Sequence, residues 1–184
     1  ASGNAKTISS GTTYTNGGNL IATSTNAAGN TTSYAYTGGR NQVYGQPSAI
    51  ADACGTTTLY TVDGYGRTER ISLESIANIQ YTYSKNLLDK LTRTTGNSSQ
   101  VYAFGYDGFG NSTGISIGTG NNARALVSYE YGAHNGLLTK QTYGNGDAWH
   151  YTYNVFDDLV SAYTTGDNSG TELKYFYNSE GALA

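Results

Sequence analysis

Residues 101–118, VYAFGYDGFGNSTGISIG, decide the fold. Aromatic and small polar residues alternate up to Tyr106, and alternation resumes after Asn111. A period of two is the signature of a half-buried β-strand. Between the two runs, Asp107 is followed three residues later by Gly110, which fits a type I turn closed by a residue with positive φ. The stretch therefore predicts a β-hairpin.

The same pattern recurs along the whole chain. When the second aromatic of each Y-x-Y pattern is aligned, successive anchors are 21 to 26 residues apart. Thirteen of the 18 tyrosines stand at an anchor or two positions before one. A fixed period in this range indicates a repeat architecture. The anchors are Tyr14, Tyr36, Val62, Tyr83, Tyr106, Tyr131, Tyr153 and Tyr177.

The residues that follow the anchors predict the turns. One position after the anchor, seven of the eight residues are Asp, Asn, Ser or Thr, whose side chains bind backbone N–H groups at the start of a turn. Four positions after it, six of the eight are Gly, Asn or Asp, which tolerate a positive φ. These six are Gly18, Gly66, Gly110, Asn135, Asp157 and Gly181.

Each unit is predicted to be strand, tight turn, strand and looser turn. The looser turns are expected at Gly29-Asn30, Gly96-Asn97, Asn145-Gly146 and Gly166-Asp167-Asn168. Gly118→Ala, in a looser turn, is expected to matter less than Gly110→Val in a tight one. The unit around residues 36–57 is the most irregular, and Pro47 and Cys54 are predicted to lie in an elongated loop. Residues 69–79 are predicted to form a strand and a turn. No segment shows a helical period.

The fold class is therefore all-β, with about half of the residues in strands. Residues i and i+2 of a strand face the same side, so each Tyr-x-Tyr pair places two rings on one face. We predict a structural role for the repeat residues Tyr14, Tyr34, Tyr36, Tyr60, Asp63, Gly66, Tyr81, Tyr83, Tyr106, Asp107, Gly110, Tyr129, Tyr131, Tyr151, Tyr153, Tyr175, Tyr177 and Gly181.

Composition excludes several classes of protein. Charged residues make up 12% of the chain and the formal net charge is −3, so no basic stripe favours nucleic acid. The single cysteine, Cys54, allows neither an intrachain disulfide nor a cysteine-based zinc site. No apolar run approaches the 18 or so residues of a membrane span. One Cys, no Met and few Lys suit an exported bacterial protein.

The pattern Y-x-Y-D-x-x-G-N-L, repeated about every 20 residues, resembles the YD repeat of the RHS-repeat proteins. Its clearest matches are residues 104–111, 60–67 and 175–183. The family includes bacterial polymorphic toxins, wall-associated proteins, the C-components of Tc toxins and teneurins. The resemblance implies about eight tandem β-hairpins in a curled, spiral antiparallel sheet that forms part of a hollow shell, often around a toxin domain or other cargo.

Two features depart from the family pattern. The Asp-Pro-x-Gly-Leu core motif of the toxin group is absent, since Pro47 is the only proline. The strict Tyr-Asp pair survives only at Tyr106-Asp107, with Val62-Asp63 close to it. We therefore expect residues 1–184 to be a single segment of shell wall from a much longer secreted or cell-surface protein, with the rest of that chain and its cargo as partners.

Candidate catalytic and metal-binding residues all have simpler interpretations. Ser112 lies in a G-x-S-x-G sequence, but it begins a returning strand, whereas a nucleophile elbow needs a strand-to-helix turn. His134 and His150 lack the carboxylate spacing of a metal site. The turn aspartates cap turns, and Trp149 is exposed or packed on the wall. We predict no catalytic residue, no cofactor and no metal.

Two functions remain open. The first is a non-catalytic shell wall that encapsulates or displays another part of the parent chain. The second is a β-hairpin module that binds choline or a cell-wall polysaccharide through aromatic cages, although such repeats use a Trp in nearly every unit and this chain has only Trp149. We also expect self-association through the terminal strands, because residues 1–14 and 173–184 carry little charge to discourage edge pairing.

Overall fold

The computed structural model describes residues 9–15, 17–74, 76–166 and 170–184. Its contacts divide the chain into two units, Ala1–Thr82 with Leu91–Ser99, and Tyr83–Lys90 with Gln100–Ala184. The described residues form 15 strands, and the hydrogen-bonded strand order follows the sequence from β1 to β15. Every strand pairing given by register is antiparallel, as expected for tandem hairpins. The all-β fold class is confirmed; the curl of the sheet stays an expectation.

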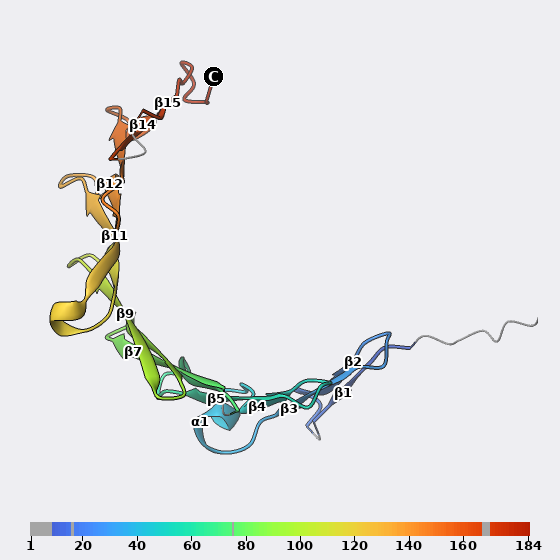
Figure 1. Cartoon of the computed structure of the whole chain (residues 1–184). Coiled ribbons are helices and arrows are strands. Elements are labelled where there is room, and N and C mark those ends of the chain that lie inside the picture. Colours follow the sequence, from blue (N-terminus) through green and yellow to red (C-terminus); the bar gives the residue numbers. More distant parts are fainter. Residues whose placement is uncertain (1–8, 16, 75, 167–169) are drawn as a thin grey trace, which may run out of the picture. The chain divides into compact units, whose positions relative to one another are not determined.

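Unit 1 contains the first three hairpins (Figure 1). Each anchor residue ends or follows the first strand of its hairpin, as at Tyr14, Tyr36 and Val62. The elements are β1 (Gly11–Tyr14), β2 (Ile21–Thr25), β3 (Thr31–Ala35), α1 (Gly39–Val43), β4 (Ala49–Ala51), β5 (Thr57–Val62) and β6 (Thr68–Leu73).

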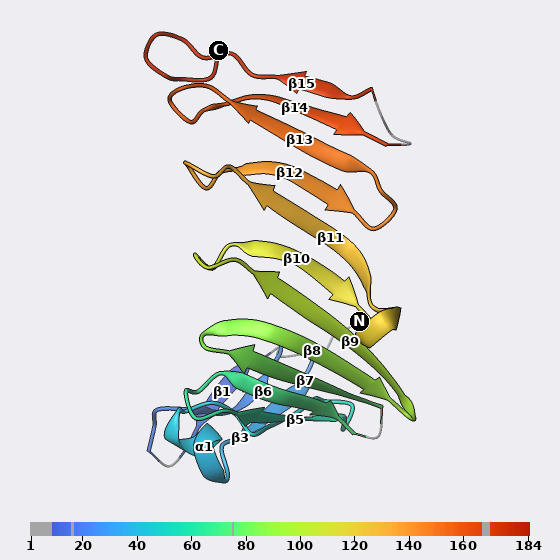
Figure 2. The same ribbon diagram turned by 90° about the vertical axis from the view of Figure 1, so that its left-hand side faces the viewer.

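Three strands have residues in both units: β7 (Ala77–Ser84), β8 (Leu87–Thr95) and β9 (Ser98–Tyr106). The strand and turn predicted for residues 69–79 are confirmed: the range contains most of β6, the turn after it and the start of β7. The remaining elements are β10 (Ser112–Ile117), η1 (Gly120–Asn122), β11 (Arg124–Tyr131), β12 (Leu138–Tyr143), β13 (Ala148–Tyr153), β14 (Leu159–Thr165) and β15 (Glu172–Lys174). Figure 2 shows the anchor turns of β9–β10, β11–β12 and β13–β14 along one edge of unit 2. The last anchor, Tyr177, is joined to Leu183 by an isolated antiparallel bridge.

The elongated loop predicted to contain Pro47 and Cys54 is wrong, because β4 lies between these two residues. Residues 36–57 hold α1 and the short strand β4, and Cys54 lies in a tight turn before β5. Side chains hold α1 against β5: the buried amide of Asn41 donates to the carbonyls of Pro47 at 3.0 Å and Tyr60 at 3.1 Å. Because tertiary contacts rather than a helical pattern make this turn of helix, the sequence carries no periodic signal for it.

The described residues of neither unit form a conventional hydrophobic core. Among the described residues only Val62, Ala148 and Ala162 are buried apolar residues, and no large side chain is fully buried. The strand residues are mostly half-buried, as expected for a single layer of sheet. Backbone ladders and cross-strand side-chain pairs therefore carry more of the stability than core packing does.

Candidate functional site

The turn that follows Val62 shows how the predicted motif works. The Oδ1 of Asp63 accepts hydrogen bonds from the backbone N–H groups of Tyr65 at 2.8 Å and Arg67 at 3.0 Å. Gly66 has a φ of 80°, which places it in the left-handed region. An L-residue there would be strained, and an added Cβ would also lie 3.0 Å from the Tyr44 ring. Glycine at this position therefore serves both the turn and the packing of Tyr44.

The same bonds recur in five further turns. In each, the Asp or Asn oxygen accepts the backbone N–H groups two and four residues later, as Asp107 does from Phe109 and Asn111, both at 2.9 Å. The corresponding turns begin at Asn26, Asp52, Asn154 and Asn178. The turns at Asn26 and Asp52 are not anchor turns; they connect β2 to β3 and β4 to β5. The looser turn predicted at Gly29-Asn30 is thus a tight one, while residues 167–169 of another looser turn lie outside the described residues.

Two of the predicted anchor turns differ in detail. In the β11–β12 turn, Gly136 has positive φ (66°) in place of Asn135, because this turn is one residue longer. In the β7–β8 turn, Lys85 has a φ of 55° and Leu87 already begins β8. At Gly18, Gly110, Asp157 and Gly181, φ is positive as expected.

Three anchor tyrosines of unit 2 join one hairpin to the next. The hydroxyl of Tyr131 donates to the carbonyl of Ser112 at 2.8 Å, that of Tyr153 to Leu138 at 2.8 Å, and that of Tyr177 to Leu159 at 2.9 Å. Each acceptor is the first residue of the returning strand in the preceding hairpin. We call these three hydrogen bonds the tyrosine clamps. They give these three anchors a physical role that the sequence spacing alone did not show.

Partial burial at the clamps affects the tyrosine hydroxyls. Desolvation raises the pKa of Tyr153, and desolvation followed by the influence of Tyr129 and Asp107 raises the pKa of Tyr131. The pKa of Tyr151 is raised by burial first, and then by nearby phenols of the repeat columns and of Tyr143. The neutral hydroxyl is therefore the form that the sheet favours.

The opposite face of unit 2 carries a polar row. Strand registers place Lys140 between Glu130 and His150, and Lys140 Nζ lies 3.3 Å from Glu130 Oε1. The His150 ring stacks on Tyr163 with 4.9 Å between ring centroids, and its Nε2 lies 3.1 Å from Thr165 Oγ1. His150 is thus held by cross-strand neighbours.

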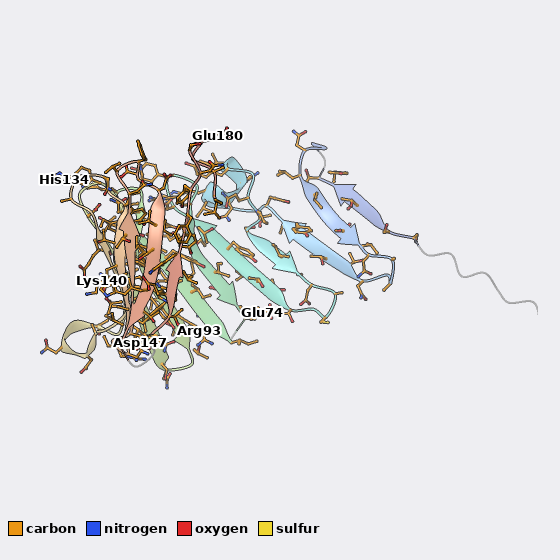
Figure 3. The ribbon with its side chains drawn as sticks, turned by 90° about the horizontal axis from the view of Figure 1, so that it is seen from above. Glu74, Arg93, His134, Lys140, Asp147 and Glu180 are labelled. Atoms are coloured by element: carbon orange, nitrogen blue, oxygen red, sulfur yellow. The ribbon has the colours of Figure 1, made fainter. Side chains whose placement is uncertain are left out.

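The candidate catalytic and metal-binding residues do not assemble. His134 lies in the β11–β12 turn, far along the strands from the Asp147 end of unit 2 (Figure 3). Ser112 begins β10 and contributes its carbonyl to a tyrosine clamp. Within the described residues, no group of three His, Cys, Asp or Glu is placed to hold a metal ion.

Open hollows occur at both strand ends of unit 2. At the β12–β13 turn, a hollow of about 460 Å³ is lined by Trp149, Tyr143, Arg124, Asn145 and their neighbours. At the opposite ends of the strands, a hollow of about 470 Å³ lies between the Asp107 and His134 turns. No helix in the described part of the chain combines the length and apolarity needed to cross a bilayer.

Comparisons with known proteins support the repeat architecture described above. The RHS Repeat family matches residues 134–169, which confirms the resemblance predicted from the sequence. No curated protein gives a significant match. A chain of the Photorhabdus luminescens Tc holotoxin pore has 17% identity and a TM-score of 0.69 over 91% of this chain. A TcdB2–TccC3 complex has 15% identity over 96% of this chain, with a TM-score of 0.35.

The first of these structures shows the fold. This chain covers only 9% of the length of the Tc holotoxin chain and 13% of the TcdB2–TccC3 chain. The strand ladder thus has a counterpart within a much longer polypeptide.

Proposed function

We propose that this RHS-repeat chain is a non-catalytic wall segment of a shell that encloses or displays another part of a longer, secreted or cell-surface bacterial protein. The observation that carries the proposal is the series of tyrosine clamps. Each clamp fixes a hairpin of unit 2 to the preceding one, and the hydrogen-bonded strands follow one another in sequence order. Such a sheet grows in one dimension and needs no core of its own.

The burial of the strands supports the same proposal. A single layer in which no large described side chain is fully buried leaves both faces for other contacts. In a shell, one face would line the interior and the other would face solvent. The match to a small part of a Tc holotoxin chain supports a segment of this kind within a longer polypeptide.

The test uses the longer protein that contains this segment. Limited proteolysis is followed by mass spectrometry, and the cleavage rate of the enclosed region is compared with that of the same region expressed alone. We expect strong protection in the intact protein. Tyr131→Phe, Tyr153→Phe and Tyr177→Phe together should weaken the wall and increase cleavage. Equal cleavage rates with and without the wall would reject encapsulation.

A second function is favoured by the hollow at Trp149. An indole and a phenol beside a guanidinium and an amide form a surface on which a sugar ring can stack and hydrogen-bond. Titration with choline and soluble glucans, followed by Trp149 fluorescence, tests this possibility. A saturable response that is lost in Tyr143→Ala but kept in Phe176→Ala, an exposed ring outside the hollow, would support a binding module. No response would leave the shell wall as the only candidate.

A further inference from the structure

Two turns of the chain share the pattern Asp-Gly-aromatic-Gly but differ in the residue that follows it. Residues 63–67 read Asp-Gly-Tyr-Gly-Arg, and residues 107–111 read Asp-Gly-Phe-Gly-Asn. Their backbones agree closely, since Gly66 and Gly110 have φ of 80° and 92° and both aspartates accept the same two N–H groups. The pair is a natural comparison in which only one turn carries a cation.

In the first turn the cation is in place. Arg67 forms an ion pair with Asp63, with Nη2 2.6 Å and Nε 2.7 Å from Oδ2. The same guanidinium lies over the Tyr65 ring, 5.1 Å from its centroid. A carboxylate on one side and an aromatic face on the other is a favourable environment for a guanidinium, which stacks on rings as well as pairing with anions.

In the second turn the carboxylate and the ring are present without a cation. The neutral Asn111 amide donates to Asp107 Oδ2 at 2.9 Å. A carboxylate has about four acceptor positions, so Asp107 can accept a further donor. The hydrogen bond from Asn111, with those from the backbone, lowers the pKa of Asp107, so that it carries its negative charge at neutral pH. Phe109 is 95% exposed, so its ring is accessible to a ligand.

The surroundings of Phe109 leave room for a ligand. Phe109, Asp107 and Asn111 form one side of the hollow of about 470 Å³, and Tyr131 and the His134 turn form the other. None of the described residues that line it is Lys or Arg. We propose that this hollow binds the guanidinium of an arginine from a basic segment of another polypeptide, in the arrangement that Arg67 adopts between Asp63 and Tyr65.

The β13–β14 turn, two hairpins further along the same edge, offers a second contact for the same segment. Phe156 is 82% exposed and lines another hollow with Asp158 and Tyr177. Here too an exposed ring and a carboxylate lie together at the anchor-turn edge of unit 2. Because each single contact is weak, a partner with several arginines would gain affinity from binding both hollows at once. This inference goes beyond the shell proposal and does not depend on it.

The test exchanges the two turns. The full chain, labelled with ¹⁵N, is titrated with N-acetyl-arginine amide at about pH 8, where free imidazole is neutral. We expect saturable amide shifts at Phe109 and Asn111 in the millimolar range. Asn111→Arg supplies the cation internally and should reduce these shifts at least tenfold. Arg67→Asn removes the internal cation and should create new shifts at Tyr65.

Controls separate this site from general screening of charge. N-acetyl-lysine amide should bind more weakly than the arginine probe, because ammonium does not stack as guanidinium does. Far-UV circular dichroism checks that both variants keep the fold. The proposal is overturned if the arginine probe gives no saturable shift at Phe109, if Asn111→Arg binds as well as the parent chain, or if the lysine probe binds equally.

Discussion

The hydroxyl of Tyr153 donates a hydrogen bond of 2.8 Å to the backbone carbonyl of Leu138, in the hairpin before its own. Two other anchor tyrosines, Tyr131 and Tyr177, make the equivalent bond. In the backbone ladder between β12 and β13, the pair nearest the anchor-turn end is Lys140 with His150. The Tyr153–Leu138 hydrogen bond joins the two strands beyond that pair. The clamp thus extends the contact between adjacent hairpins to their anchor-turn ends.

Removal of one clamp should destabilise the sheet measurably. Tyr153→Phe keeps the ring but leaves the Leu138 carbonyl without this donor, so we expect a loss of about 0.5–1.5 kcal/mol in the free energy of unfolding. Tyr163→Phe is the matched control, because among the described residues the Tyr163 hydroxyl has no hydrogen bond and the His150 stack would persist. Urea unfolding measures both variants. Equal effects would mean that the clamp contributes nothing.

The fold should lose stability in alkali. Burial raises the pKa values of Tyr131, Tyr151 and Tyr153 above the ordinary value of about 10. The folded chain therefore holds these protons more tightly than the unfolded chain, and their contribution is complete below about pH 10 and is lost as the pH rises through the raised values. Urea midpoints at pH 8 and above pH 10 test this. A midpoint that is unchanged or higher in alkali would contradict the assignment.

Glycine at position 110 should matter more than glycine at 108, two residues earlier in the same turn. Gly110 has a φ of 92°, so Gly110→Ala should cost about 1 kcal/mol or more through backbone strain. Gly108 lacks a positive φ and an added Cβ meets nothing within 4 Å, so Gly108→Ala should be neutral or slightly stabilising. Thermal or urea unfolding that ranks the two variants in the opposite order would refute the turn geometry.

The same geometry corrects an expectation about Gly118. Its φ is 98°, and an added Cβ would lie 2.7 Å from the backbone oxygen of Asn122. Gly118→Ala is therefore not the mild substitution that its place in a looser turn suggested. Gly108→Ala replaces it as the control.

Self-association through the last strand remains a prediction. In the described part of the chain β15 pairs only with β14, and Leu173 on it is 46% exposed. Leu173→Lys should reduce any association seen by light scattering across a concentration series, because charge discourages edge pairing. Thr119→Lys adds the same charge in an exposed turn and should not. A strictly monomeric chain at high concentration would contradict the prediction. At the other end, residues 1–8 lie outside the described residues.

The sequence was informative where local chemistry decides the structure. The Asp-to-Gly spacing of three residues located the turns at Gly66 and Gly110. The same spacing from Asn26 to Gly29 would have identified the turn there as tight, and that from Asp52 to Gly55 would have located a turn that was missed. Alternation located the strands and the face of the tyrosine pairs.

Most of the features that the sequence did not predict depend on contacts between residues that are not neighbours in the sequence. Helix α1 begins after Gly38 without a side-chain cap and is held by the Asn41 amide on the carbonyls of Pro47 and Tyr60. The tyrosine clamps join residues 15 to 19 positions apart, which requires knowledge of how hairpins pair. The stack of Arg67 on Tyr65 was visible only as a spacing of two residues, which alone does not indicate contact.

The most direct test of the hairpin ladder is the set of nuclear Overhauser contacts made by the Tyr153 ring in a solution NMR spectrum of the chain. We expect contacts from the ring protons near the hydroxyl to the backbone of Leu138 and Thr139, with equivalent contacts from Tyr131 to Ser112. Contacts of the Tyr153 ring with a hairpin that is not adjacent in sequence, or none with Leu138, would contradict the stacking of hairpins in sequence order.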